Sequence, residues 1–173
     1  MAAALEERPA ADPRRRFHLE HRDDPGGDDI GIGVARAIRA AADEVRTRHA
    51  VDLYCGVGVF AGALADRGWS VTAIDGAPSA VADAHHNLDN LDVEVIEHDV
   101  TTWAAEPSEL VVADPSRAWL GPDGVATIAA SGADRVVLVS CDTHALARDA
   151  EHLSAAGYSL GRATPLDPFP HTH

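Results

Sequence analysis

The sequence DLYCGVGVF at residues 52–60 decides the fold. Its apolar beginning is typical of a buried strand, and Gly56 and Gly58 permit a tight turn that brings bare backbone close to a ligand. The residues that follow predict a helix, whose free N–H groups would point at whatever binds the turn. The stretch therefore predicts a strand–turn–helix unit with a ligand beyond the carboxyl end of the strand.

The same alternation continues along the chain from this unit. Helices are predicted at 31–48, 58–67, 79–88, 122–132 and 144–156, and strands at 49–54, 70–75, 93–97, 110–114, 135–141 and 158–166. Strands separated by helices of about 10 residues indicate βαβ units and a parallel sheet. The sequence thus predicts an α/β domain over residues 31–173. Residues 1–30, rich in Ala, Pro, Arg, Asp and Gly, are expected to form an irregular arm.

The residues around the turn leave two classes of ligand open, a dinucleotide and another nucleoside cofactor. A dinucleotide site expects G-x-G-x-x-G, and here the next glycine, Gly62, comes one residue late. Asp75 follows the second strand, where a carboxylate accepts hydrogen bonds from ribose hydroxyls in either class. The spacing alone does not choose between them.

Four blocks, in the same order, resemble the S-adenosylmethionine-dependent RNA (uracil-C5) methyltransferases, which form 5-methyluridine in transfer and ribosomal RNA. The first is residues 52–60, and the second is DPSR at 114–117, similar to D-P-P-R. The third is VSCD at 139–142 with ALARD at 145–149, similar to S-C-N-P-x-T-L-A-R-D. The fourth is DPFPHTH at 167–173, similar to D-x-F-P-x-T-x-H. The resemblance implies a class I methyltransferase domain, a Rossmann-like three-layer sandwich around a mostly parallel sheet.

The resemblance implies a site for S-adenosylmethionine, with S-adenosylhomocysteine as the product. Gly56 and Gly58 would face the methionine and ribose portions, Asp75 the ribose hydroxyls and Asp99 the adenine amino group. The implied cofactor-binding residues are Asp52, Tyr54, Gly56, Gly58, Phe60, Asp75, Asp99 and Asp114. The alternative for Asp75 and Asp99 is that they are turn residues at strand ends.

The resemblance also implies covalent catalysis on uracil. Cys141 would add to C6 of the base and thereby make C5 nucleophilic. Asp114 would hydrogen-bond the pyrimidine edge of a flipped base, and Arg117 would contact the substrate. Cys141 precedes a predicted helix, whose N-terminal dipole favours a thiolate; the alternative is an inert core thiol. Cys55 is interpreted as a small packing residue.

The sequence departs from the family pattern in three places. It ends at His173, ahead of the family's proton-accepting glutamate and of the antiparallel seventh strand. The strand at 158–166 is therefore expected to lack a partner unless another segment fills the gap, and release of Cys141 from uracil is expected to be slow. The family's F-x-Q motif has FHLE at 17–20 as its nearest match, with no glutamine anywhere. The N-terminal RNA-binding β-barrel of many relatives has no counterpart here.

The net charge argues against a nucleic-acid partner. It is −14, with a pI near 4.9, whereas RNA-binding surfaces are usually basic. RNA is the substrate that the resemblance implies. Two competing functions remain, a catalytically impaired cofactor-binding module and a methyltransferase for a small molecule. An acidic surface conflicts less with a small-molecule substrate than with RNA.

Bulk features give the remaining expectations. No apolar run approaches the roughly 20 residues of a membrane span, and the charged first residues are unlike a signal peptide, so a cytoplasmic location is expected. Two cysteines and ten histidines show no zinc-site spacing, so no metal is expected. The oligomeric state is left open.

Overall fold

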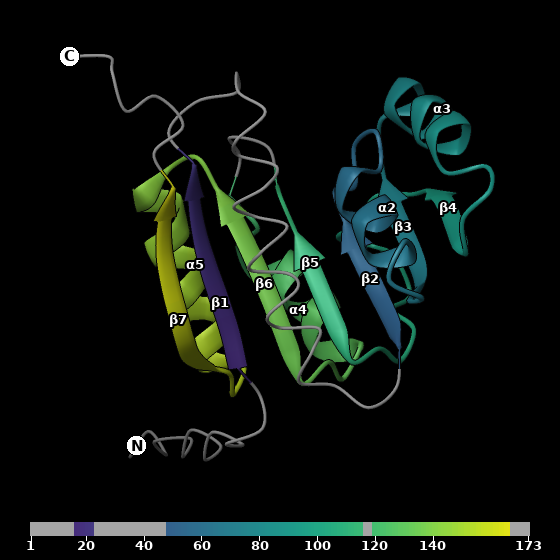
Figure 1. The fold of residues 1–173 in the computed structure, drawn as a ribbon. Helices are drawn as coiled ribbons and strands as arrows, with labels where there is room; N and C mark the ends of the chain where they lie inside the picture. Colours follow the sequence, from purple (N-terminus) through teal and green to yellow (C-terminus); the bar gives the residue numbers. More distant parts are fainter. Residues whose placement is uncertain (1–15, 23–47, 116–118, 167–173) are drawn as a thin grey trace, which may run out of the picture.

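The fold is built on one parallel sheet (Figure 1). The computed structural model describes residues 16–22, 48–115 and 119–166. Its strands are β1 (Arg16–Arg22), β2 (His49–Leu53), β3 (Ser70–Asp75), β4 (Val93–Glu97), β5 (Leu110–Ala113), β6 (Arg135–Ser140) and β7 (Ser159–Leu166). Their order is β4-β3-β2-β5-β6-β1-β7, and every pairing among these strands is parallel. The predicted α/β fold with a mostly parallel sheet is confirmed.

The described helices connect successive strands. They are α2 (Val59–Ala65), α3 (Pro78–Asn87), α4 (Gly121–Ala130) and α5 (Thr143–Ala155). Each begins and ends within two residues of its predicted bounds, because the strand–helix alternation is written in the local hydrophobic pattern. The helix predicted at 31–48 lies, apart from its last residue, outside the described residues.

Two apolar cores lie on opposite faces of the sheet and make three layers. Along each strand the side chains alternate between the faces. In one core, Ala50, Val112 and Val137 of the sheet pack with residues of the helical layer. These are Ala61 and Leu64 of α2, Ala84 of α3 and Leu88, the residue after α3. The other joins Val51, Val111 and Val136 to Val125, Ile128, Leu146 and Leu153 of α4 and α5. The side chains of β5 are buried on both faces of the sheet, which is why its sequence is a continuous apolar run.

The strand β1 corrects one expectation and answers one open question. Residues 16–22, part of the expected irregular arm, form a strand that lies between β6 and β7 (Figure 1). Its residues pair in register with both neighbours, His21 for example with Ser140 and with Pro165. Of the alternatives left open for the strand at 158–166, the structure shows the one in which another segment fills the gap, because β1 pairs with β7. An unpaired strand edge in that place would leave backbone groups unsatisfied.

Candidate functional site

The carboxyl ends of the strands gather the predicted residues at one edge of the sheet. Tyr54 follows β2, Asp75 ends β3 and Asp99 lies two residues after the end of β4. Asp114 follows β5, and Cys141 follows β6. In parallel α/β sheets this edge is where ligands bind, and the structure assembles the predicted residues there from five strands.

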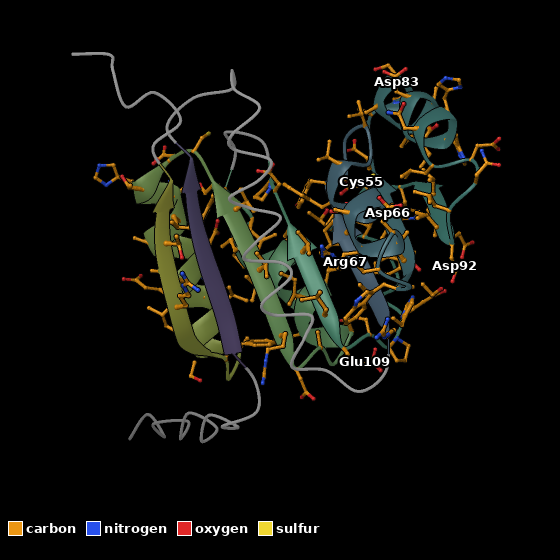
Figure 2. All side chains as sticks on the ribbon, viewed as in Figure 1. Cys55, Asp66, Arg67, Asp83, Asp92 and Glu109 are labelled. Carbon is orange, nitrogen blue, oxygen red and sulfur yellow. The ribbon has the colours of Figure 1, made fainter. Side chains whose placement is uncertain are left out.

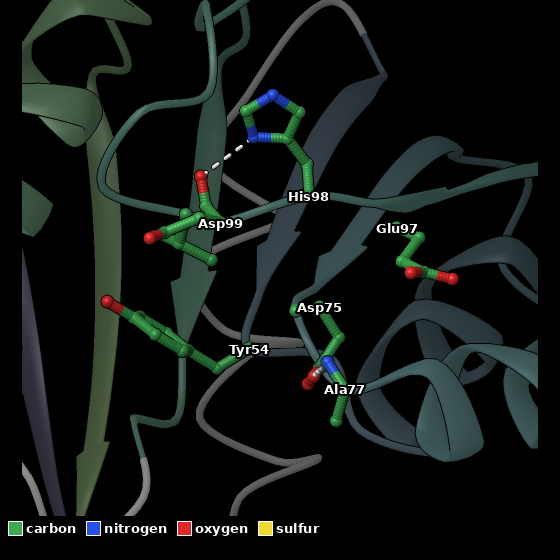
Figure 3. Close-up of a pocket in the computed structure, with 8 residues that line it drawn as sticks. Tyr54, Asp75, Ala77, Glu97, His98 and Asp99 are labelled. Atoms are coloured by element: carbon green, nitrogen blue, oxygen red, sulfur yellow. Dashed lines mark hydrogen bonds between the residues drawn. The ribbon is translucent and has the colours of Figure 1, made fainter.

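A pocket of about 450 Å³ opens at the ends of β2, β3 and β4 (Figure 3). Its size is in the range of about 300–1,000 Å³ that is usual for small-molecule sites. The lining residues are Tyr54, Asp75, Gly76, Ala77, Glu97, His98, Asp99 and Val100. Three of the predicted cofactor residues, Tyr54, Asp75 and Asp99, are among them.

Asp75 holds the glycine turn beside the pocket. Its Oδ2 accepts the Gly56 N–H at 2.9 Å, and its Oδ1 accepts the Ala77 N–H at 2.8 Å. Each carboxylate oxygen has a further lone pair, which a ligand hydroxyl can use. Gly56 has a φ of +55°, and a Cβ built on it would meet nothing within 4 Å. The turn therefore presents bare backbone to open space next to a carboxylate that can accept hydroxyl hydrogen bonds.

Tyr54 and Asp99 also line the pocket, and Asp99 lies at its exposed rim. Tyr54 adopts a left-handed φ of 59°, which is uncommon for a bulky residue and often found at functional sites. Burial raises the pKa of its phenol, and the negative charges of Asp99 and Asp149 add to the rise. Asp99 is exposed, and its Oδ1 accepts the Thr101 hydroxyl at 2.7 Å and the Thr101 N–H at 2.9 Å. These hydrogen bonds lower the pKa of Asp99, so the pocket has a fixed, ionised acceptor at its rim.

Asp52, Gly58 and Phe60 support the turn from behind. Asp52 is fully buried, and its Oδ2 accepts the Ala61 N–H at 2.9 Å, which ties β2 to α2. Burial raises the Asp52 pKa to about 8, and its Oδ1 has no hydrogen-bond partner among the described residues. A Cβ on Gly58 would lie 2.5 Å from Leu88 Cδ1, so this glycine permits close packing against the end of α3. Phe60 is half-buried against the same core. A direct cofactor contact by these three stays a prediction.

The second half of the edge carries Asp114 and Cys141. β5 pairs with both β2 and β6, so the end of β5 lies between the glycine turn and the Cys141 turn. Cys141 is half-buried and precedes Asp142, which caps α5 by accepting the N–H groups of His144 at 2.7 Å and Ala145 at 3.1 Å. Asp114 is half-buried, and its N–H donates to Leu53 O at 3.3 Å. Arg117, the predicted substrate contact, lies outside the described residues.

The two thiols differ in burial and in their place in the fold. Cys55 is 6% exposed and belongs to the core between the sheet and α2 (Figure 2). Burial, with the negative charges of Asp52 and Asp75, raises its pKa to about 12, so Cys55 stays a neutral thiol near neutral pH. Cys141 is half-buried at the ligand edge. The interpretation of Cys55 as a packing residue agrees with this geometry.

Sequence reasoning missed several residues of the site. Glu97 and His98 line the pocket through their position at the end of β4, and the rule that ligands lie beyond strand ends was the signal that could have found them. Asp149 was noticed only as part of a motif, and its carboxylate is 1% exposed. Within residues 48–115 and 119–166, no cluster of three or more His, Cys, Asp or Glu side chains is arranged to hold a metal ion. No helix described in the structure is long and apolar enough to cross a membrane.

The strand order and the pocket define the class of the domain. Without β1 the order follows the doubly wound pattern, and the pocket lies beyond the ends of its first three strands. A methyltransferase-domain family matches residues 50–115. The precorrin 8w decarboxylase of Methanobacterium thermoautotrophicum superposes with a TM-score of 0.64 at 22% identity, covering 79% of this chain and 75% of that one. The described residues therefore have the class I methyltransferase fold.

Closer relatives narrow the class. The Pyrococcus abyssi tRNA (uracil-54, C5)-methyltransferase, solved with S-adenosyl-L-homocysteine, superposes with a TM-score of 0.62 at 29% identity, over 70% of this chain and 31% of that one. The 23S rRNA (uracil(1939)-C(5))-methyltransferase RlmD of Enterobacter sp. (strain 638) is 44% identical over 132 residues, 70% of this chain and 30% of the relative. An uncharacterized RNA methyltransferase of Streptomyces avermitilis is 39% identical over 72% of this chain and 30% of its own length.

The domain is therefore related to the methyltransferase domain of the RNA (uracil-C5) methyltransferases, as the four sequence blocks indicated. The chain spans about 30% of the length of these curated relatives.

Proposed function

We propose that this chain binds S-adenosylmethionine in the pocket at the ends of β2, β3 and β4. The residues present fit the cofactor, because Asp75 has lone pairs for ribose hydroxyls and Asp99 is an ionised acceptor for an adenine amino group. The open space above Gly56 leaves room for the methionine portion. When bound there, the cofactor supplies a sulfonium methyl group as the electrophile. A solved relative with S-adenosyl-L-homocysteine supports the assignment.

The proposed reaction is methyl transfer to C5 of a uridine in RNA. The Cys141 thiolate forms a bond to C6, and the electron pair of the C5–C6 double bond moves into an enolate that makes C5 nucleophilic. C5 gains the methyl group as the bond between this group and the sulfonium sulfur breaks, which leaves S-adenosylhomocysteine. The C5 proton then passes to water or to a basic side chain of the protein. The electron pair then reforms the double bond and expels the Cys141 thiolate. Asp114 hydrogen-bonds the edge of the flipped base.

One observation carries this proposal, namely that the pocket and Cys141 share one edge with β5 between them. Neighbouring strands are about 4.8 Å apart, so the ends of β2 and β6 are separated by about 10 Å. A pyrimidine ring above the end of β5 would have a thiol on one side and the cofactor pocket on the other. Asp114 is at that strand end.

Trapping with 5-fluorouridine RNA and S-adenosylmethionine tests the proposal. Fluorine at C5 cannot leave as a proton, so a protein–RNA adduct accumulates and survives denaturing electrophoresis. We expect the adduct with the native chain and with Cys55→Ala, and no adduct with Cys141→Ala. Absence of the adduct in the native chain, or its persistence in Cys141→Ala, would overturn the covalent mechanism.

The charge of the molecule favours a second candidate, a small-molecule acceptor. Exposed acidic side chains such as Asp66, Asp83 and Asp92 lie around α2, α3 and the link to β4 (Figure 2). With a net charge of −14, such a surface repels phosphate backbones. A catalytically impaired cofactor-binding module is the third candidate, and a cytoplasmic location remains a prediction. Transfer of a labelled methyl group to unmodified RNA, compared with a panel of small acceptors, separates these functions.

A further inference from the structure

The loop after β5 is held at its far end by a carboxylate from another helix. Asp149, on α5, accepts the N–H of Leu120 at 2.9 Å through Oδ2 and the N–H of Gly121 at 3.0 Å through Oδ1. Its side chain is 1% exposed, so both hydrogen bonds are formed away from solvent. Such bonds to a charged acceptor are stronger than neutral ones, and a buried donor left without its acceptor is costly.

The Asp149 carboxylate caps the N-terminus of α4, which has no capping side chain of its own. The residue before α4, Leu120, forms no side-chain cap, and α4 begins at Gly121 with a φ of +71°. The free N–H groups of a helix N-terminus attract an anion, and here that anion comes from a position 28 residues further along the chain. The beginning of α4 is therefore fixed relative to α5.

Two further side chains of α5 hold the same turn. The guanidinium carbon of Arg148 lies 4.7 Å from the centre of the Trp119 ring, within the range of a cation–π contact. The His152 ring centre lies 5.6 Å from that of Trp119. We call Trp119, Arg148, Asp149 and His152 the α5 clasp.

The α5 clasp connects the two loops that carry the proposed catalytic residues. Asp114 begins the loop that ends at Trp119 and Leu120. Cys141 lies two residues before the first residue of α5, Thr143, and Asp149 follows Thr143 by six residues, or about 9 Å of helix. Cys141 therefore lies just before the N-terminus of α5, and Asp149 on the same helix holds the end of the loop that begins at Asp114.

The clasp also reaches the cofactor pocket. A Cβ on Gly124, in the first turn of α4, would lie 3.4 Å from the Tyr54 hydroxyl and 2.6 Å from Leu120 Cδ1. The beginning of α4 therefore packs against the pocket residue Tyr54.

We propose that Asp149 is a positioning residue for the proposed methyl transfer. By accepting the Leu120 and Gly121 N–H groups, it fixes the end of the loop that begins at Asp114 relative to Cys141. This inference rests on the proposed function. Asp149 does not touch the reacting atoms. Its effect is to hold the base-binding loop and the thiol in one geometry, which is where small misplacements cost most in rate.

Asp149→Asn tests the inference, because the amide keeps the shape of the side chain but places an NH₂ group against one of the two N–H donors. With 5-fluorouridine RNA at saturation, we expect adduct formation to slow by at least about tenfold, while S-adenosylhomocysteine affinity changes by less than about threefold. Leu153→Val is the matched control, since Leu153 is buried on α5 one turn further on and outside the clasp. Measured well below its melting temperature, this variant should form the adduct at the native rate.

The outcomes separate this inference from the proposed function. No adduct with the native chain overturns the proposed function. An adduct with the native chain and an equal rate with a folded Asp149→Asn overturns the positioning role, as does an equal slowing in Leu153→Val. Should Asp149→Asn fail to fold, Asp149→Glu replaces it, because the longer side chain keeps a carboxylate acceptor but shifts the point at which Leu120 and Gly121 are held. We then expect a fewfold slower adduct with unchanged S-adenosylhomocysteine affinity, and a native rate overturns the inference.

Discussion

The two halves of the sheet edge are built in different ways. The half at β2, β3 and β4 forms its pocket from consecutive strand–turn segments, with Asp75 holding the turn that begins at Gly56. The half at β5 and β6 depends on contacts between distant segments, such as Asp149 with Leu120 and β1 with β6. The methyltransferase-domain match, residues 50–115, covers the first half, continues through β5 and Asp114 of the second half, and ends before β6. The first half therefore depends mainly on turns that directly follow its strands, whereas the second half depends on contacts between segments far apart in the sequence.

The variant with the largest expected effect removes the proposed nucleophile, Cys141, which lies in the second half. Cys141→Ala should lower methyl transfer to RNA by about 10³-fold or more, because no other group replaces a covalent nucleophile. Its affinity for S-adenosylhomocysteine, measured by isothermal titration, should equal that of the native chain. A parallel loss of cofactor affinity would show that the two halves are not separate.

Packing behind the glycine turn gives the next largest effect. Gly58→Ala places a methyl group 2.5 Å from Leu88 Cδ1 at a φ of +88°, so the free energy of unfolding should fall by about 3 kcal/mol. Gly132→Ala is the control, with a φ of +68° and nothing within 4 Å, and should cost about 1 kcal/mol. Urea denaturation measures both. Equal losses would mean that backbone strain, not the approach of α3, requires glycine at position 58.

The buried carboxylate behind the turn makes stability depend on pH. Folding raises the Asp52 pKa from 3.8 to about 8, so between these values the folded state holds a proton that the unfolded state has lost. Stability from this group is therefore full below pH 4 and falls as the pH rises toward 8, at up to about 1.4 kcal/mol per pH unit. Asp52→Asn mimics the protonated form. It should gain about 2 kcal/mol over the native chain between pH 6 and pH 8 in urea titrations. A constant difference over that range would contradict the protonated state.

The smallest expected effect concerns the pocket itself. Asp75→Asn puts an amide NH₂ against the N–H of Gly56 or Ala77, which should loosen the turn and weaken ribose binding. We expect S-adenosylhomocysteine to bind about tenfold more weakly by isothermal titration, a loss of about 1.4 kcal/mol. Asp92→Asn is the control, because Asp92 is exposed in the same half and outside the pocket lining. An equal loss in the control would assign the effect to surface charge.

The sequence predicted the strands and helices after residue 48 within two residues, because each has its own hydrophobic period and its own turn residues. Three of the residues that it placed at strand ends line the pocket, namely Tyr54, Asp75 and Asp99. The sequence did not predict β1, although Phe17 and Leu19 alternate with charged residues as in a strand. The strands that pair with β1 begin at Arg135 and Ser159, more than 100 residues further along the chain. A local sequence pattern does not identify pairing partners at that separation.

The sequence by itself determined the parallel α/β sheet, the glycine turn and the carboxylates at the strand ends, because periodicity and turn chemistry act within a few residues. The tertiary structure alone decided that β1 completes the sheet and that Asp149 grips the beginning of α4. The physical reason is that burial and hydrogen bonding between distant segments depend on how the whole chain packs. The same packing left Asp52 protonated and Cys55 a thiol while placing Cys141 at the ligand edge.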